Sequence, residues 1–142
     1  MDVVTFGGRS GLRLELAPAP WPYRDTDKQP AWNARLTGRG LAVSLLCPEA
    51  DWYRSLAAFL ADLGPFRDGK KGWSGPSEWQ SGELELQLKV TQTASNAVSV
   101  EVVLTDGAPP RWQCEATLEL DPGAFGQIAS DARRLSAVSL AM

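Results

Sequence analysis

The chain has 142 residues, of which 44% are hydrophobic and 22% are charged, and its net charge is −3. This length and composition are typical of a globular protein, and we expect a single α+β domain over residues 1–142. The acidic balance disfavours direct binding to nucleic acid. No apolar run approaches the roughly 18 residues that a membrane span needs. Residues 1–8 lack the basic and apolar regions of a secretory signal, so we expect a cytoplasmic protein.

Residue types that carry much of enzyme chemistry are missing or isolated. Histidine is absent, which removes the commonest general base and the commonest metal ligand. Cys47 and Cys114 are the only cysteines; neither has the nearby partner of a redox or metal motif, and both suit a buried, inert role. Asp25 and Asp27 have cation-ligand spacing, but the rest of a calcium loop does not follow, and a solvated loop is the better interpretation. We therefore predict no catalytic residue, no cofactor, no metal site and no enzymatic activity.

The N-terminal half of the chain is patterned as two β-hairpins. Residues 3–16 combine a short β-branched run, a glycine-rich turn and an alternating run, and residues 32–46 alternate on both sides of a turn at 38–40. Alternation of apolar and polar residues is typical of half-buried strands. The segment 17–30 contains four prolines, which deny backbone hydrogen bonds, so we expect an irregular connection there.

A helix is predicted to follow the second hairpin. Pro48 suits the first position of a helix, and the acidic residues after it favour the positive end of the helix dipole. An apolar stripe at helical spacing continues to Leu63, and Gly64 with Pro65 ends the helix. The stripe consists of Trp52, Leu56, Phe59, Leu60 and Leu63.

The stretch from Lys70 to Trp79 joins this helix to the next elements. It contains Trp73 and Trp79, with two glycines and a proline around them. Tryptophan both stacks on ligands and anchors loops onto a core. We favour the anchoring role for at least one of the two, so that the loop forms the corner between the helix and the strands that follow.

Three consecutive strands with short turns are the clearest pattern in the sequence. Apolar and polar residues alternate over 83–91, 98–105 and 112–120, which predicts an antiparallel meander with one covered face and one wet face. Asp121 and Pro122 suit the start of a last helix. Its apolar stripe consists of Phe125, Ile128, Ala129, Ala132 and Leu135. The predicted fold is therefore α+β: two N-terminal β-hairpins, one helix, a three-stranded antiparallel meander, and a C-terminal helix packed on the sheet.

Residues from Asp51 to about Leu135 resemble a known family. The matching features are Leu56-x-x-Phe59-Leu60-x-x-Leu63, Gly72-Trp73-x-Gly75-x-x-x-Trp79, Glu83-Leu84-x-Leu86, the valine strand, Trp112, and Leu120-Asp121-Pro122-Gly123. They resemble a family of small bacterial domains of unknown function, which is similar to the immunity proteins that neutralise wall-associated contact-inhibition toxins (WapI-type). The resemblance implies a partner-binding protein without catalytic activity.

The wet face of the predicted meander is acidic, with one opposing lysine, Lys89. Because immunity proteins against nucleases often present acidic surface to a basic active site, and because such charge steers association, this face is a candidate partner site. A merely solvated face is the simpler interpretation. The candidate partner-binding residues are Glu83, Glu85, Glu101, Glu115, Glu119, Trp73 and Trp79.

Two other functions remain open at this stage. The chain would be a structural or accessory domain that self-associates, for example as a homodimer through the meander or an edge strand. Alternatively, Trp73 and Trp79 would form a small-molecule site together with carboxylates such as Glu78 or Asp25. The expected partner in the leading interpretation is a protein, a cognate toxin or another, and neither nucleic acid nor membrane.

Overall fold

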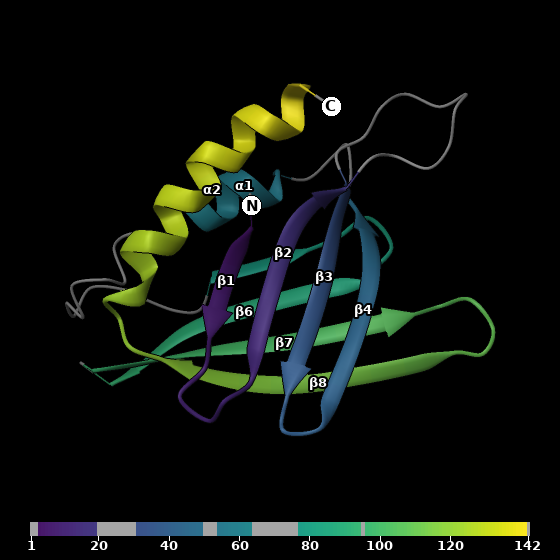
Figure 1. Ribbon diagram of the computed structural model, residues 1–142, viewed down its shortest axis with the longest axis horizontal. Coiled ribbons are helices and arrows are strands. Elements are labelled where there is room, and N and C mark those ends of the chain that lie inside the picture. Colours follow the sequence, from purple (N-terminus) through teal and green to yellow (C-terminus); the bar gives the residue numbers. More distant parts are fainter. Residues whose placement is uncertain (1–2, 20–30, 50–53, 64–76, 95, 142) are drawn as a thin grey trace.

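The computed structural model describes residues 3–19, 31–49, 54–63, 77–94 and 96–141, with side chains as far as Leu135. These residues form two four-stranded antiparallel sheets and two helices (Figure 1). The N-terminal sheet has the strand order β1 (Val4–Gly7), β2 (Arg13–Ala19), β3 (Ala31–Gly38) and β4 (Leu41–Pro48). The C-terminal sheet has the order β5 (Ser77–Gln80), β6 (Leu86–Ala94), β7 (Ala97–Asp106) and β8 (Trp112–Leu120). The helices are α1 (Leu56–Ala61) and α2 (Ala124–Ala141).

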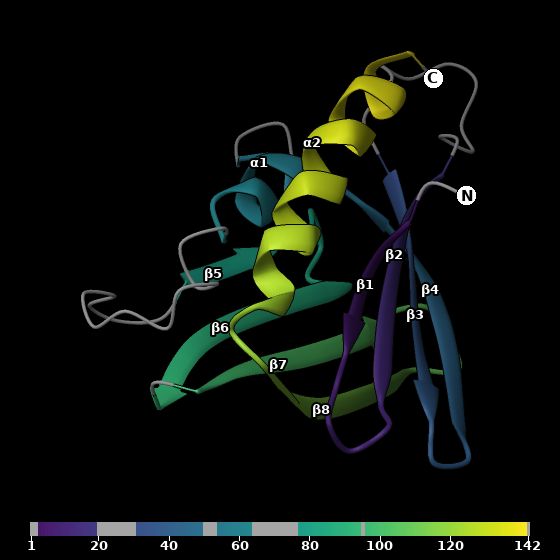
Figure 2. The same ribbon diagram turned by 60° about the vertical axis from the view of Figure 1, so that its left-hand side comes forward.

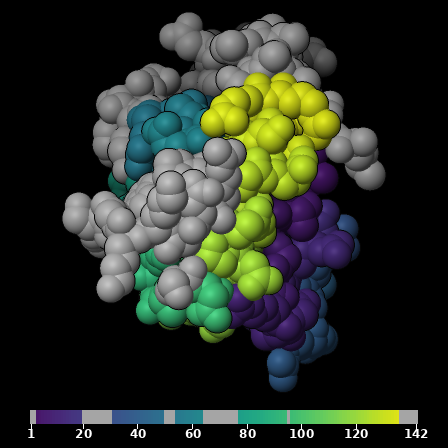
Figure 3. Space-filling model, turned by 90° about the vertical axis from the view of Figure 1, so that its left-hand side faces the viewer, coloured from purple at the N-terminus to yellow at the C-terminus, as the bar shows by residue number. Residues whose placement is uncertain are grey.

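The two sheets face each other across one core. Their strands cross at a steep angle, and the two helices close the side that the sheets leave open (Figures 1 and 2). From that side, α2 lies between α1 and the first strands (Figure 3). Phe6 of β1 packs edge-to-face on Phe125 of α2, with ring centroids 6.3 Å apart. Burying a side chain of this size contributes about 1.5–3 kcal/mol, so this contact fixes α2 against the N-terminal sheet.

The α+β class is confirmed, but the arrangement of the hairpins differs from the prediction. The two N-terminal hairpins form one sheet, because β2 and β3 pair from Arg13–Thr37 to Ala19–Ala31. Part of the proline segment predicted to be irregular, 17–19, belongs to β2. Pro18 is tolerated there because β1 begins at Val4, opposite Leu16, so no residue of β1 pairs with the proline.

The meander gains a fourth strand, β5, in a stretch that was predicted to be loop. This strand has only four residues and one inward side chain, too few for the alternation to stand out in the sequence. Trp79 is that side chain; it lies opposite Leu88 and is 2% exposed. Its Nε1 donates a 2.9 Å hydrogen bond to the carbonyl of Arg54. The anchoring role that we favoured therefore holds for Trp79, whereas Trp73 lies outside the described residues.

Both helices begin later than predicted. Pro48 belongs to β4, because the β3–β4 ladder continues through Cys47 to Pro48. Helix α1 begins after Ser55, whose Oγ accepts a 3.1 Å hydrogen bond from the Ala58 amide. The backbone carbonyl of Asp121 accepts a 3.0 Å hydrogen bond from the Ala124 amide, so Asp121 and Pro122 form a turn before α2 and are not part of the helix.

The predicted apolar stripes do form the core. Every α2 stripe residue is buried, and so are the α1 stripe residues that the structure describes. Cys47 is buried and Cys114 is half-buried, and both are free thiols. Burial raises the pKa of the Cys47 thiol to about 12, which keeps it protonated and inert at neutral pH. The buried stripes are Leu56, Phe59 and Leu60 in α1 with Leu63 in the turn after it, and Phe125, Ile128, Ala129, Ala132 and Leu135 in α2.

Candidate acidic face

The outer face of the C-terminal sheet carries most of the acidic side chains predicted to bind a partner. Its inward residues, such as Leu88 and Val102, are buried, so their neighbours along each strand point to solvent. We call the outward set Glu78, Lys89, Glu101, Glu115 and Glu119 the acidic face.

Strand pairing brings three of these glutamates together. Glu101 on β7 lies opposite Thr117, while Glu115 and Glu119 on β8 lie two residues to either side of that threonine. Diagonal neighbours of this kind are about 7–8 Å apart in an antiparallel sheet. The three carboxylates therefore form a zigzag across the last two strands, and their mutual repulsion favours an incoming cation.

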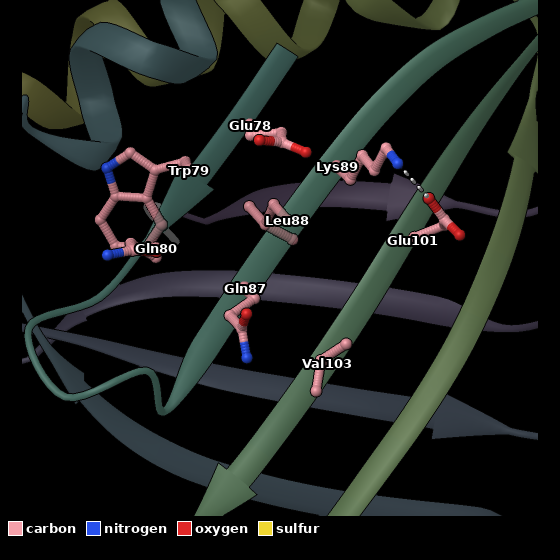
Figure 4. A pocket seen from close by; sticks show the side chains of 8 residues that line it. All are labelled: Glu78, Trp79, Gln80, Gln87, Leu88, Lys89, Glu101 and Val103. Carbon is pink, nitrogen blue, oxygen red and sulfur yellow. Dashed lines mark ion pairs between the residues drawn. The ribbon is translucent and has the colours of Figure 1, made fainter. Parts of the chain in front are cut away.

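Lys89 moderates this charge only weakly. Its Nζ lies 4.0 Å from the Glu101 Oε2, and both side chains are about half exposed. Exposed ion pairs contribute about 0–1 kcal/mol, so a partner can displace this one at little cost. Glu78 sits directly across from Lys89 on β5, and Figure 4 shows Lys89 between the two acidic strand positions.

Two adjoining depressions make this face uneven. One has a volume of about 330 Å³ and lies over β5, β6 and β7 (Figure 4). The other has a volume of about 360 Å³ and lies over β7 and β8. Glu101 and Val103 line both. A partly exposed valine bordered by carboxylates suits the aliphatic stem and charged end of a lysine or arginine side chain.

The Glu119 carboxylate forms an ion pair with Arg9 of the same chain. Arg9, in the turn between β1 and β2, places Nη1 2.6 Å from the Glu119 Oε1, and its amide donates a 2.8 Å hydrogen bond to the Glu119 carbonyl. Its Nη2 also contacts the Asp121 carboxylate. These acceptors raise the pKa of Arg9, with Asp121 the larger cause. Glu119 therefore joins the two sheets at the rim of the acidic face.

Glu83 and Glu85 lie in the β5–β6 turn and not on the acidic face, because β6 begins only at Leu86. The Glu85 carboxylate accepts hydrogen bonds from Ser81 Oγ at 2.6 Å and from the Glu83 amide at 3.0 Å. Ser81 Oγ in turn accepts from the Leu86 amide at 2.9 Å. Glu85 thus shapes the turn, while Glu83 is exposed beside it.

Neither Glu78 nor Glu49 was among the predicted partner-binding residues, and only Glu78 belongs to the acidic face. Glu78 joins the acidic face through β5, and the polar–apolar–polar run from Glu78 to Gln80 was the available signal. Glu49 is 6% exposed and accepts a hydrogen bond from the Leu56 amide at the start of α1. Burial raises the pKa of Glu49, and the Leu56 amide and the Trp32 indole partly oppose that rise. Glu49 is therefore a buried structural group, with no part in a surface site.

Fold and site together define an α+β domain of two crossed meanders with one acidic outer face. The chain belongs to a family of unknown function, DUF6228, whose model matches residues 8–138. No curated protein and no solved structure matches it. Within the described ranges, no cluster of three or more cysteine, aspartate or glutamate side chains is placed to hold a metal ion. No helix in those ranges combines the length and apolar character needed to cross a membrane.

Proposed function

We propose that this protein is a non-enzymatic binding module of the immunity type, whose acidic face receives a basic surface of a partner protein such as a bacterial toxin. The observation that supports it most is the zigzag of Glu101, Glu115 and Glu119, with Glu78 on the same face. Among the described residues, Lys89 forms a weak exposed pair with Glu101, and Arg9 binds Glu119 at the rim. The excess negative charge suits a cationic partner.

The position of this charge favours protein binding over chemistry. The carboxylates stand on paired strands, which hold them in fixed positions relative to one another. A toxin that cleaves nucleic acid needs a basic surface for phosphate, and an acidic face of matching spacing would occupy that surface. Charge of this kind also speeds encounter between partners.

The small-molecule alternative loses one of its two tryptophans. Trp79 is buried, and its indole N–H is already bonded to the Arg54 carbonyl. A ligand could stack on Trp79 only if β5 left the core.

The direct test is binding to the product of a neighbouring toxin-like gene, measured by co-purification and titration calorimetry. We expect a stable complex whose affinity falls as salt is raised, because exposed charges are screened beyond about 10 Å at 0.1 M salt. Absence of a complex at micromolar concentration, or a complex indifferent to salt, would contradict the proposal.

A further inference from the structure

Strand β4 is an unusual sheet edge. Its eight residues, Leu41-Ala42-Val43-Ser44-Leu45-Leu46-Cys47-Pro48, carry no charge. The other edges are protected: β1 and β5 have four residues each, and β8 carries Glu115 and Glu119. Proteins usually shorten or charge their edge strands because a long uncharged edge pairs readily with another strand.

The turn before β4 determines which backbone groups face outward. Arg39 and Gly40 have φ values of 54° and 84°, as the two-residue type I′ turn requires. Gly38 and Leu41, which flank that turn as partners, then form a hydrogen-bonded pair. Because bonded and non-bonded pairs alternate, the N–H and C=O groups of Ala42, Ser44 and Leu46 point away from β3. No described strand pairs with that side of β4.

Partly buried apolar side chains lie beside these backbone groups. Leu41, Val43 and Leu45 face the core but are only partly buried, whereas the inward side chains of β3 are fully buried. Trp112 and Cys114 of β8 are likewise only partly buried against the core. In Figure 1 the β7–β8 hairpin passes behind β4 and extends beyond its edge. A strand added to β4 would therefore gain both hydrogen bonds and apolar contacts.

We propose that β4 pairs antiparallel with β4 of a second copy of this chain, about a two-fold axis at Ser44. Ser44 would then lie opposite Ser44 of the partner subunit, and Ala42 opposite Leu46 of the partner subunit. The outward groups are bounded by the 39–40 turn on one side and by Pro48 on the other, which has no N–H and whose carbonyl already accepts a 2.9 Å hydrogen bond from the Gly82 amide. They are thus centred on Ser44, and a two-fold axis there satisfies all of them.

The lack of charge on β4 favours a second copy as the occupant. In an isologous contact the same strand of each copy forms both sides of the interface. A charged residue near the two-fold axis would therefore lie close to the same charge in the other copy. Ala42 and Ser44 are small, exposed and uncharged, so the two paired strands bring no like charges together; Arg35, opposite Ser44 on β3, lies one strand further from the axis. The dimer would contain one continuous eight-stranded sheet. β4 contributes no residue to the acidic face, so this inference and the proposed function can fail independently.

Charge variants at the axis test the pairing. Ser44→Lys and Ser44→Glu each place like charges opposite each other in the dimer, whereas a one-to-one mixture places a lysine opposite a glutamate. By sedimentation velocity, we expect the unmodified protein to be a dimer at high concentration, each variant a monomer, and the mixture a dimer again. Asn33→Lys is the control, because it adds the same charge to the exposed outer face of β3, away from the axis. It should remain dimeric.

A monomeric wild-type protein at millimolar concentration would overturn the proposal, and so would a Ser44→Lys dimer or a mixture that stays monomeric. Ser44→Cys gives a second measurement that does not depend on charge. Opposed residues of a bonded antiparallel pair have Cα atoms about 5.5 Å apart, within the range of a disulfide. We expect oxidation to cross-link Ser44→Cys into a dimer but to leave Asn33→Cys and the wild type uncross-linked. Failure of Ser44→Cys to cross-link would also contradict the pairing.

Discussion

The N-terminal and C-terminal sheets share one topology and differ in everything that faces solvent. Each is a four-stranded antiparallel meander. On the N-terminal sheet, Glu15 lies opposite Arg35 and 3.9 Å from Arg13, so its one carboxylate is flanked by two arginines. On the C-terminal sheet, glutamates outnumber their cations. The two sheets therefore differ in their outward residues and edges and not in their topology.

The largest effect should come from the core that both sheets share. Trp79→Ala removes a buried indole and its hydrogen bond, and we expect it to lower the free energy of unfolding by about 3–5 kcal/mol. Gln80→Ala changes the next residue on the same strand, which faces outward, and should stay within about 0.5 kcal/mol of wild type. Urea denaturation measures both. Equal effects of the two substitutions would show that β5 does not face the core as described.

A smaller effect on stability, and one that depends on pH, should come from Glu49, which lies beside the buried tryptophan of the N-terminal sheet. The Trp79 indole has the Arg54 carbonyl as acceptor, whereas Trp32 Nε1 has no acceptor in normal geometry among the described residues and lies beside Glu49. Burial raises the pKa of Glu49 from its ordinary 4.5. The native state therefore holds this proton more tightly than the unfolded state, and stability is lost as pH rises through the folded pKa.

Glu49→Gln tests this pH dependence. The variant keeps an oxygen to accept from the Leu56 amide but does not ionise, so it should gain stability relative to wild type as pH rises. Urea denaturation at about pH 5 and about pH 8 measures the difference between the two proteins. A difference that does not change with pH would mean that Glu49 does not titrate across this range.

The smallest effect concerns the turn that leads from β5 to β6. Leu84 is 43% exposed and has a φ of 65°, a conformation that costs an ordinary residue about 1–2 kcal/mol. Leu84→Gly relieves this strain, but glycine also has more conformational freedom in the unfolded chain, which offsets part of the gain. The net effect should be a rise of about 0.5–1 kcal/mol in the free energy of unfolding. Leu84→Ala is the control, since alanine keeps the strain. If Leu84→Gly gains nothing over Leu84→Ala, strain at this position is negligible.

The sequence was sufficient for the features that depend on periodicity. The apolar stripes of both helices and the strands from Leu86 to Leu120 were predicted, because burial on one face leaves a repeating pattern. Strand β5 and the start of α1 were missed. The first has only one inward residue, and at the second the pairing of Cys47 with Trp32 overrides the local preference of Pro48 for a helix start.

The candidate site was harder to predict than the fold. Alternation alone placed Glu101, Glu115 and Glu119 on one face, but it could not show that Arg9, more than a hundred residues away, binds Glu119. It also placed Glu85 on a strand, whereas a hydrogen bond from Ser81 holds that carboxylate in a turn. Contacts between distant segments decide which charges remain available, and local patterns do not record them.

The most direct test of the acidic face compares one charge reversal on each sheet. Glu101→Lys and Glu15→Lys each change the charge by the same amount, and each breaks one surface ion pair, at 4.0 Å and 3.9 Å respectively, although Glu15 is the less exposed of the two glutamates. Binding to the product of the neighbouring toxin-like gene is measured by titration calorimetry, with melting temperature as the check on folding. We predict that Glu101→Lys weakens binding by about 30-fold, or about 2 kcal/mol, and that Glu15→Lys leaves it unchanged. Equal losses from the two variants, or no loss from Glu101→Lys, would contradict the account.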